Sequence, residues 1–173
     1  MSGLLLTLDA GTTSVKGALF DAAGNMLCAR VHEYTLEKPA PDIVELDPEV
    51  YWQAARTVIA DILAETAVPP VSIAALGVTS QGETLIVLDR QGRPLRKAIV
   101  WLDNRAKDEA TAILEAFGRD RVYEVTGQQD IVPGWPASKI LWLRRHEPQV
   151  FKAAASFLML EDYLVYRLTG RLA

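Results

Sequence analysis

The sequence is poor in cysteine and histidine, and it contains no long apolar run. A single cysteine, Cys28, excludes an internal disulfide framework and a cysteine-cluster zinc site, and the two separated histidines add no transition-metal site. The longest largely apolar run, residues 153–160, is far shorter than the ~20 residues that span a bilayer. These absences predict a protein of a reducing compartment, the cytoplasm, with no membrane partner.

An excess of positive charge is also lacking. The 18 lysines and arginines are outnumbered by 22 acidic residues, and the net charge of -4 leaves no electrostatic footprint for nucleic acid. The 173 residues, half of them hydrophobic, suffice for one domain with a true core. We therefore expect a small molecule as the partner, and self-association into a homo-oligomer stays open.

Alternating apolar residues predict three strands at the start of the chain, over residues 4–8, 15–21 and 26–35. The polar segment 21–25, with its glycine, predicts a turn between the second and third strands. Together these segments predict an antiparallel meander.

Asp47 and Pro48 predict the start of a long helix, because aspartate caps helix N-termini and proline suits the first helical position. The helix is predicted to end at residues 69–70, and the two prolines within 39–41 predict a loop before it. Its buried stripe is predicted to hold six apolar residues: Tyr51, Ala55, Val58, Ile59, Ile62 and Leu63.

The rest of the chain shows weaker signals of the same kinds. They predict strands over 72–79 and 84–88, a turn over 89–94, a short apolar segment over 98–102, helices over 104–117, 137–145 and 161–168, and a loop over 128–136. The first of these helices is predicted to stop at Gly118 and to bury four side chains: Ala110, Ile113, Leu114 and Phe117.

The segment between the first two predicted strands is rich in groups that bind phosphate. Asp9 stands at a strand end and is followed by a glycine, three hydroxyl residues and Lys16. A tight loop can aim backbone N–H groups, hydroxyls and a lysine at one phosphate, and the aspartate suits a hydrated Mg2+. The segment matches neither of the common glycine-rich phosphate loops. A plain β-hairpin turn is the alternative interpretation.

Segments 9–17, 44–52, 98–105, 133–139 and 162–170 together resemble the FGGY family of carbohydrate kinases, in the family's order and at similar spacing. The resemblance covers essentially the whole chain. It implies an α/β fold of the ribonuclease H-like type, in the actin-like ATPase superfamily, with a mixed β-sheet that begins with an antiparallel meander and is flanked by helices. It also implies ATP and Mg2+ as cofactors and transfer of the γ-phosphoryl group of ATP to a sugar hydroxyl.

The resemblance implies two groups of site residues. The group for the ATP phosphates consists of Asp9, which would also hold the Mg2+, with Gly11, Thr12, Thr13, Ser14 and Lys16. The group for the sugar consists of Gln81, Glu83, Trp101, Asp103 and Trp135.

The resemblance also bears on the substrate. Gly82 stands where glycerol kinases carry an arginine, and residues 133–135 are closer to the xylulokinase form of this loop. We therefore expect a ketose or polyol kinase, with a xylulose-like pentulose favoured as the substrate. A glycerol-type polyol kinase and a non-catalytic sugar- or phosphate-binding module are the alternatives.

Several of these residues also suit plain structural roles. Asp103 is well placed to cap the helix predicted from Asn104, and Glu83 suits a solvated strand end. Trp52 and Trp142 lie on helical patterns and are predicted to be core residues, and Trp101 follows an apolar segment that leaves the same role open to it.

The resemblance places the family's catalytic base beyond the segment that ends at Gly170, so the base is expected beyond Ala173 and no catalytic residue is predicted in this chain. The C-terminal nucleotide-binding domain is expected to be absent as well. Residues 1–173 are thus predicted to be the N-terminal, sugar-binding domain of such a kinase and to be inactive alone.

Overall fold

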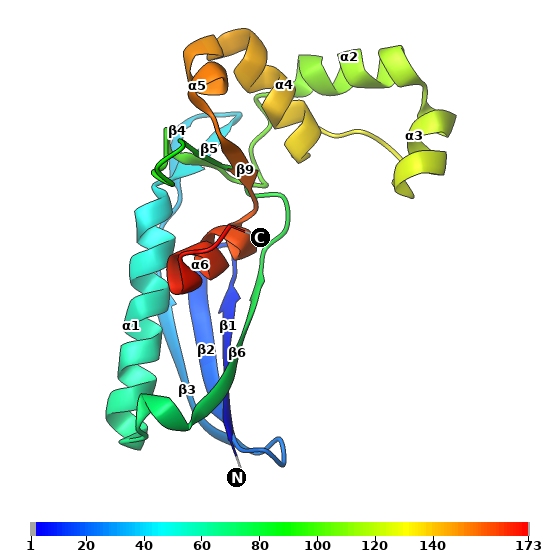
Figure 1. The fold of residues 1–173 in the computed structure, drawn as a ribbon. Helices are drawn as coiled ribbons and strands as arrows, with labels where there is room; N and C mark the ends of the chain where they lie inside the picture. The colour runs from blue at the N-terminus through cyan, green and yellow to red at the C-terminus, as the bar shows by residue number, and fades with distance from the viewer. Residues whose placement is uncertain (1–2, 173) are drawn as a thin grey trace. The chain divides into compact units, whose positions relative to one another are not determined.

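The computed structural model describes residues 3–172, which form two compact units (Figure 1). Of the described residues, unit 1 comprises 3–36, Asp47–Gln81 and 160–172, and unit 2 comprises Glu37–Leu46 and Gly82–Met159. Among the described residues, no helix is both long enough and apolar enough to cross a membrane.

Unit 1 is built on a four-stranded mixed sheet in the order β3-β2-β1-β6. Strands β1 (Leu4–Ala10), β2 (Ser14–Phe20) and β3 (Met26–Glu33) form the predicted antiparallel meander. Strand β6 (Ile73–Ser80), also predicted, pairs with β1 in parallel, so both strands end at the same edge of the sheet. A 3-10 turn, η1 (Pro70–Ser72), leads into β6.

Helices α1 (Pro48–Thr66) and α6 (Leu160–Thr169) pack on one face of this sheet. Gly17 of β2 allows α1 to approach closely, since a Cβ at Gly17 would lie only 2.4 Å from Val58 Cγ1. Leu8 of β1 pairs with Gly17 of β2 on one side and with Val78 of β6 on the other, so Gly17 and Val78 lie on the same face of the sheet. On that face, Val78 lines a shallow groove together with Val165 of α6.

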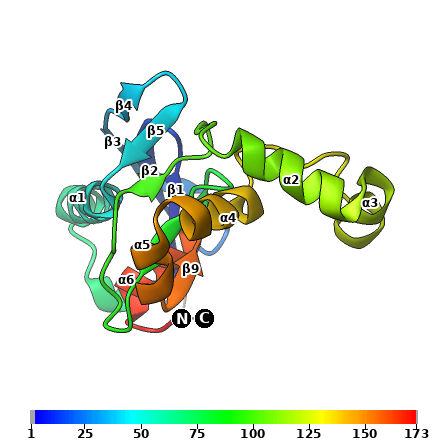
Figure 2. The same ribbon diagram turned by 90° about the horizontal axis from the view of Figure 1, so that it is seen from above.

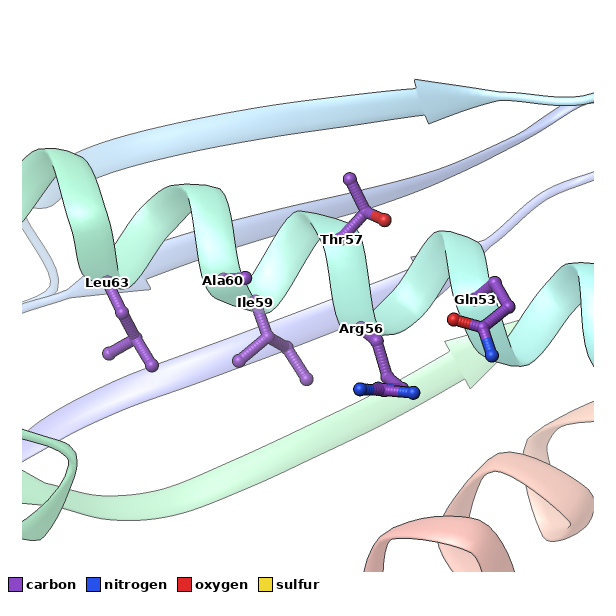
Figure 3. A pocket seen from close by; sticks show the side chains of 6 residues that line it. All are labelled: Gln53, Arg56, Thr57, Ile59, Ala60 and Leu63. Atoms are coloured by element: carbon purple, nitrogen blue, oxygen red, sulfur yellow. The ribbon is translucent and has the colours of Figure 1, made fainter.

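Helix α1 begins where the sequence predicts. The Asp47 Oδ1 accepts a hydrogen bond from the backbone N–H of Glu49 at 2.9 Å, Pro48 is the first helical residue, and Ala67 ends the helix in the left-handed conformation. Four of the six predicted stripe residues are buried, whereas Ile59 and Leu63 are half-buried. These two border a groove of about 380 Å³ along the helix, which is lined by Gln53, Arg56, Thr57, Ile59, Ala60 and Leu63 (Figure 3).

Unit 2 contains two small sheets and four helices. Strands β4 (Glu37–Ala40), β5 (Ile43–Leu46) and β8 (Ala98–Ile99) form one sheet, and β7 (Ile86–Leu88) pairs with β9 (Ser156–Leu158). The helices are α2 (Lys107–Phe117), α3 (Arg119–Thr126), α4 (Pro136–His146) and α5 (Pro148–Ala153). Figure 2 shows α4 beside α2, with α3 following α2. One buried hydrophobic cluster of this unit consists of Leu85, Val87, Ile99 and Leu143.

The structure corrects several predictions in unit 2. The loop predicted at 39–41 is instead the β4–β5 hairpin, where Pro39 is tolerated because β4 is an edge strand and needs no N–H there. Helix α2 begins at Lys107, three residues later than predicted, and Phe117 at its end is 65% exposed. Helices α3 and α5 were not predicted, because 8 and 6 residues are too short for a clear helical pattern.

The two tryptophans predicted to be core residues are half-buried. Trp142 packs against the core of unit 2 and stacks on His146 with ring centroids 5.0 Å apart. Trp52 lies under the guanidinium of Arg167, whose Cζ is 4.8 Å from the ring centroid in unit 1. Each indole therefore contacts a polar side chain, His146 for Trp142 and Arg167 for Trp52, and is not surrounded by apolar side chains alone.

Candidate functional site

The loop between β1 and β2 is a tight turn held by hydrogen bonds. The backbone N–H of Gly11 donates to the Ser14 carbonyl at 2.9 Å, and the backbone N–H of Tyr34 donates to the Thr13 carbonyl at 2.9 Å. The Tyr34 hydroxyl donates to the Gly11 carbonyl at 2.5 Å. These bonds hold the backbone of the loop in one conformation, and the donors suited to a phosphate are its N–H groups and hydroxyls.

Asp9 and Lys16 are directly opposite each other in the β1–β2 register, on the sheet face opposite Leu8 and Gly17. Within residues 3–172, the Asp9 carboxylate accepts no hydrogen bond and makes no ion pair of 4.0 Å or less. A half-buried carboxylate with unfilled oxygen atoms, next to a loop of hydroxyl groups, fits a hydrated Mg2+, which prefers oxygen ligands.

Gln81 follows β6 and lies beside this loop in unit 1. Its backbone N–H donates to the Ala10 carbonyl at 2.8 Å, and its Nε2 lies 3.4 Å from the Tyr51 hydroxyl. Its Oε1 is buried, and no described residue donates a hydrogen bond to it. A buried polar atom of this kind needs a partner, and a ligand hydroxyl or a water molecule would supply one.

Two tyrosines pack beneath the loop. The rings of Tyr34 and Tyr51 meet edge to face with centroids 5.1 Å apart. Burial raises the pKa of Tyr34 and of Tyr51 well above the usual value, and the negative charge of Asp9 contributes to the shift at Tyr34. Both hydroxyls therefore stay protonated, and Tyr34 remains a donor to the loop.

Unit 2 brings together Glu83, Trp101 and Gly134. A Cβ at Gly134 would lie 2.7 Å from the Trp101 carbonyl oxygen and 3.8 Å from Glu83 Oε2. The backbone N–H of Trp101 donates to the buried Thr84 Oγ1 at 3.2 Å, which ties the two segments together. The Trp101 side chain is 40% exposed. The Glu83 carboxylate and the backbone of Trp101 thus lie on either side of Gly134.

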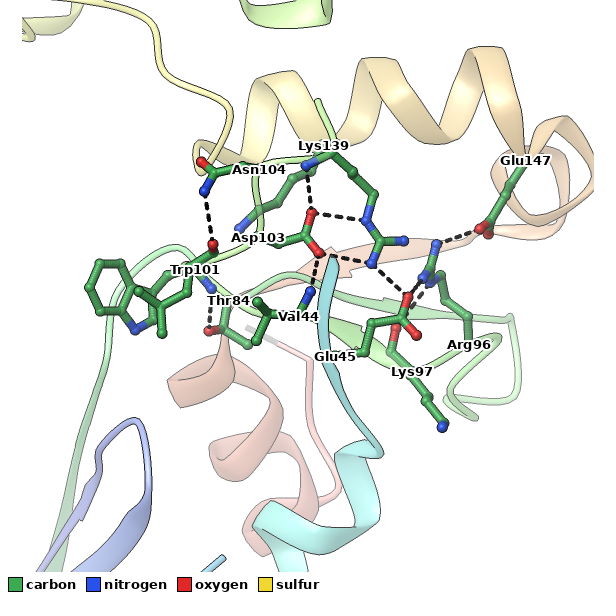
Figure 4. A network of polar contacts seen from close by, with 12 residues as sticks. Val44, Glu45, Thr84, Arg96, Lys97, Trp101, Asp103, Asn104, Lys139 and Glu147 are labelled. Atoms are coloured by element: carbon green, nitrogen blue, oxygen red, sulfur yellow. Dashed lines mark hydrogen bonds and ion pairs between the residues drawn. The ribbon is translucent and has the colours of Figure 1, made fainter. Parts of the chain in front are cut away.

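Asp103 is fully buried at the centre of a polar network (Figure 4). Its Oδ2 accepts from the Val44 backbone N–H at 2.7 Å and from Arg105 Nη2 at 2.8 Å, and its Oδ1 accepts from Arg105 N at 3.0 Å and Nε at 2.9 Å. Arg105 Nη2 also forms an ion pair with Glu45 Oε1 at 2.7 Å. Arg96 forms ion pairs with both Glu45 and Glu147.

The capping role predicted for Asp103 is wrong. Helix α2 has Ala106 at its N-cap and no side-chain capping bond, because residues 101–106 form turns before the helix begins. Asp103 instead ties this turn segment to β5.

Residues 4–173 match the N-terminal domain of the FGGY family of carbohydrate kinases. The chain belongs to this family. It is 35% identical over 170 residues to the xylulose kinase of Escherichia coli (strain K12), and 36% identical over 176 residues to the glycerol kinase of Thermococcus gammatolerans (strain DSM 15229 / JCM 11827 / EJ3). These alignments cover 98% of the chain and 34% and 35% of the two relatives, respectively.

A solved structure agrees with the family assignment. The gluconate kinase from Lactobacillus acidophilus is similar with a TM-score of 0.90 and 29% identity, over 99% of this chain and 34% of that one. The FGGY resemblance and the α/β, actin-like ATPase fold are thereby confirmed. The chain spans about a third of the length of these relatives.

The site residues predicted for this FGGY domain fall in both units. Asp9, the loop residues and Gln81 lie in unit 1, whereas the other four candidates for the sugar lie in unit 2. Trp135 faces a separate neighbourhood there: it lines an apolar groove of about 340 Å³ with residues of α2 and α3, including Ile113 and Val122.

Lys139 lies in the family segment 133–139 of the FGGY domain, but no role was predicted for it from the sequence. This lysine on α4 is fully buried, and its Nζ donates to the Glu83 carbonyl at 2.6 Å. One signal for it was present, because Lys139 precedes the core residue Leu143 by four positions and so shares its helix face.

Proposed function

We propose that this FGGY domain is the N-terminal, sugar-binding part of an ATP-dependent kinase that phosphorylates a ketose or polyol. The observation that carries the proposal is the convergence of Glu83, Trp101 and Gly134 in unit 2. A carboxylate accepts hydrogen bonds from sugar hydroxyls, while an exposed indole covers the C–H surface of a polyol. Gly134 keeps this region open, since any side chain there would collide with the Trp101 carbonyl.

Asp103 is proposed to support the sugar site without contacting the sugar itself. Its two oxygens already accept four hydrogen bonds, and its side chain is fully buried. We therefore assign it the task of fixing the turn that carries Trp101. Trp135 is proposed to anchor the loop that contains Gly134, because its side chain lines the apolar groove beside α2 and α3.

The β1–β2 loop is proposed to receive the ATP phosphates and Mg2+. The hydroxyls of Thr12, Thr13 and Ser14 and the amine of Lys16 would donate to phosphate oxygens, and Gly11 closes the turn through its N–H bond to the Ser14 carbonyl. Asp9 would hold the cation through water, as its unfilled carboxylate oxygens allow. The Mg2+, when bound, supplies positive charge that neutralises the phosphates.

A xylulose-like pentulose is proposed as the substrate. Gly82 leaves no arginine beside Glu83, which is the feature that separates this chain from the glycerol kinase pattern. Glycerol is the second candidate, and the 36% identity to a glycerol kinase favours it to a similar degree as the 35% identity to a xylulose kinase favours the pentulose.

The catalytic base and the adenine-binding domain are proposed to lie outside this chain, since it matches only about a third of its relatives. A cytoplasmic location is part of the same proposal and is supported by the single cysteine.

The test is a coupled assay of ADP release by the protein encoded by the complete reading frame that contains this chain, with D-xylulose, D-ribulose, glycerol and D-gluconate as acceptors. We expect MgATP-dependent turnover, fastest with a pentulose. Turnover fastest with glycerol would move the assignment to the polyol class, and no turnover with any acceptor would leave a binding module without catalysis.

A further inference from the structure

Lys139 of α4 is a fully buried lysine without a matching ion pair. Lysine is almost never fully buried unless its charge is paired. Within residues 3–172, its Nζ makes no salt bridge of 4.0 Å or less, and it donates a hydrogen bond to a backbone group, the Glu83 carbonyl, at 2.6 Å. Burying this ammonium group costs desolvation free energy, which a structural or functional role of the lysine would explain.

The residue that accepts this bond has a strained backbone. Glu83 has a φ of 66°, in the left-handed region that residues other than glycine rarely adopt. Strain of this kind persists only where the surroundings hold it, and it concentrates at functional sites. The Lys139 hydrogen bond holds the backbone carbonyl of Glu83, and the Glu83 carboxylate lies near Gly134, where an added Cβ would be 3.8 Å from Oε2.

The charges around Lys139 are consistent with this role. Burial lowers the pKa of Lys139 to about 8, while the negative charges of Asp103 and Glu83 favour the ammonium form and Arg105 opposes it. At neutral pH the side chain is therefore still mainly a charged donor, and a charged donor forms a stronger hydrogen bond to a carbonyl than a neutral one.

We propose that Lys139 is a positioning residue for the sugar site, which holds Glu83 in its left-handed conformation and so keeps the Glu83 carboxylate beside Gly134 and Trp101. The inference rests on the proposed function, because it takes Glu83 as a sugar ligand. A purely structural lysine would stabilise the fold without affecting sugar affinity.

A double-mutant cycle measured by isothermal titration calorimetry separates these roles. D-xylulose, glycerol and D-gluconate are titrated into the wild-type chain, and the sugar that binds is then used with Lys139→Met, Glu83→Ala and the double variant. Lys152→Met, an exposed lysine on α5, is the matched control. Circular dichroism and thermal melts confirm folding of each variant.

We expect Lys139→Met to weaken binding by about tenfold or more, and to weaken it little further once Glu83 is alanine, because the lysine acts through that residue. Unchanged affinity in Lys139→Met, or full additivity with Glu83→Ala, overturns the inference while sparing the proposed function. Absence of binding of all three probes to the wild-type chain instead overturns the proposed function and the inference with it.

If Lys139→Met does not fold, Lys139→Arg takes its place in the cycle. Arginine keeps the charge but moves the donor atoms, so we expect a folded protein with affinity at least about threefold weaker. Wild-type affinity in Lys139→Arg would then contradict the positioning role.

Discussion

Gly134 shows how one missing side chain shapes the proposed sugar site. In Gly134→Ala, the new Cβ would meet the Trp101 carbonyl at 2.7 Å, and a backbone carbonyl cannot swing aside as a side-chain end can. We expect the free energy of unfolding to fall by about 1–3 kcal/mol, the usual cost of overpacking, together with weaker sugar binding. Urea unfolding measures the stability change.

Gly77→Ala serves as the matched control, since a Cβ there meets nothing within 4 Å. An equal loss of stability in both variants would show that Gly134 is not specially constrained.

Lys139 should give the protein a characteristic pH dependence. Burial lowers its pKa from the ordinary lysine value of 10.5 to about 8 in the folded state, so between these pH values the unfolded chain binds a proton that the folded chain lacks. As pH rises from about 8 to about 10, Lys139 therefore increases the free energy of unfolding by on the order of 1–3 kcal/mol. Above about pH 10 the raised pKa values of Tyr34 and Tyr51 act in the opposite direction.

Urea unfolding at several pH values checks this prediction. Lys139→Met should lose the rise, whereas Lys152→Met, which alters an exposed lysine, should keep it. The same pH dependence in wild type and Lys139→Met would assign the rise to another group.

At the scale of elements, α1 depends on its cap. Asp47→Ala removes the hydrogen bond that the Glu49 N–H donates to Asp47 Oδ1, so we expect the free energy of unfolding to fall by about 1 kcal/mol. The control is Asp61→Ala, at an exposed position in the middle of the same helix. Equal effects of the two substitutions on the urea midpoint would contradict a capping contribution.

The elements that the sequence predicts well are those with strong local signals. Asp47 and Pro48 mark the start of α1, and alternation marks the meander, because both signals depend on neighbours in the chain. The β4–β5 hairpin was not predicted because Pro39 normally argues against a strand and only its place at a sheet edge permits it.

The candidate site shows the same division. The hydroxyl-rich loop after Asp9 is predictable from local sequence, since its groups are consecutive. The contact between Lys139 and Glu83 joins residues 56 positions apart and follows from the packing of α4, so no local pattern reveals it. Asp103 likewise changes from a predicted helix cap to a tie to β5 through its bond to Val44, 59 positions away.

At the scale of the whole molecule, the two units hold different parts of the proposed chemistry. Unit 1 carries the loop proposed for the ATP phosphates together with Gln81, and unit 2 carries the other four residues proposed for the sugar. Because the chain matches about a third of its kinase relatives, we expect the 173-residue chain to transfer no phosphate from ATP to D-xylulose by itself. A coupled ADP assay with the purified chain checks this, and steady release that depends on both ATP and sugar would contradict it.

Binding of a polyol by Glu83 and its neighbours is the central proposal for this domain. It is tested most directly by calorimetric titration of D-xylulose into the wild-type chain and into Glu83→Ala, with the exposed Glu115→Ala on α2 as the control. We predict saturable binding to the wild type and to Glu115→Ala, and affinity at least about tenfold weaker for Glu83→Ala. Wild-type affinity in Glu83→Ala, or no heat of binding to the wild type up to about 10 mM sugar, would contradict the proposal.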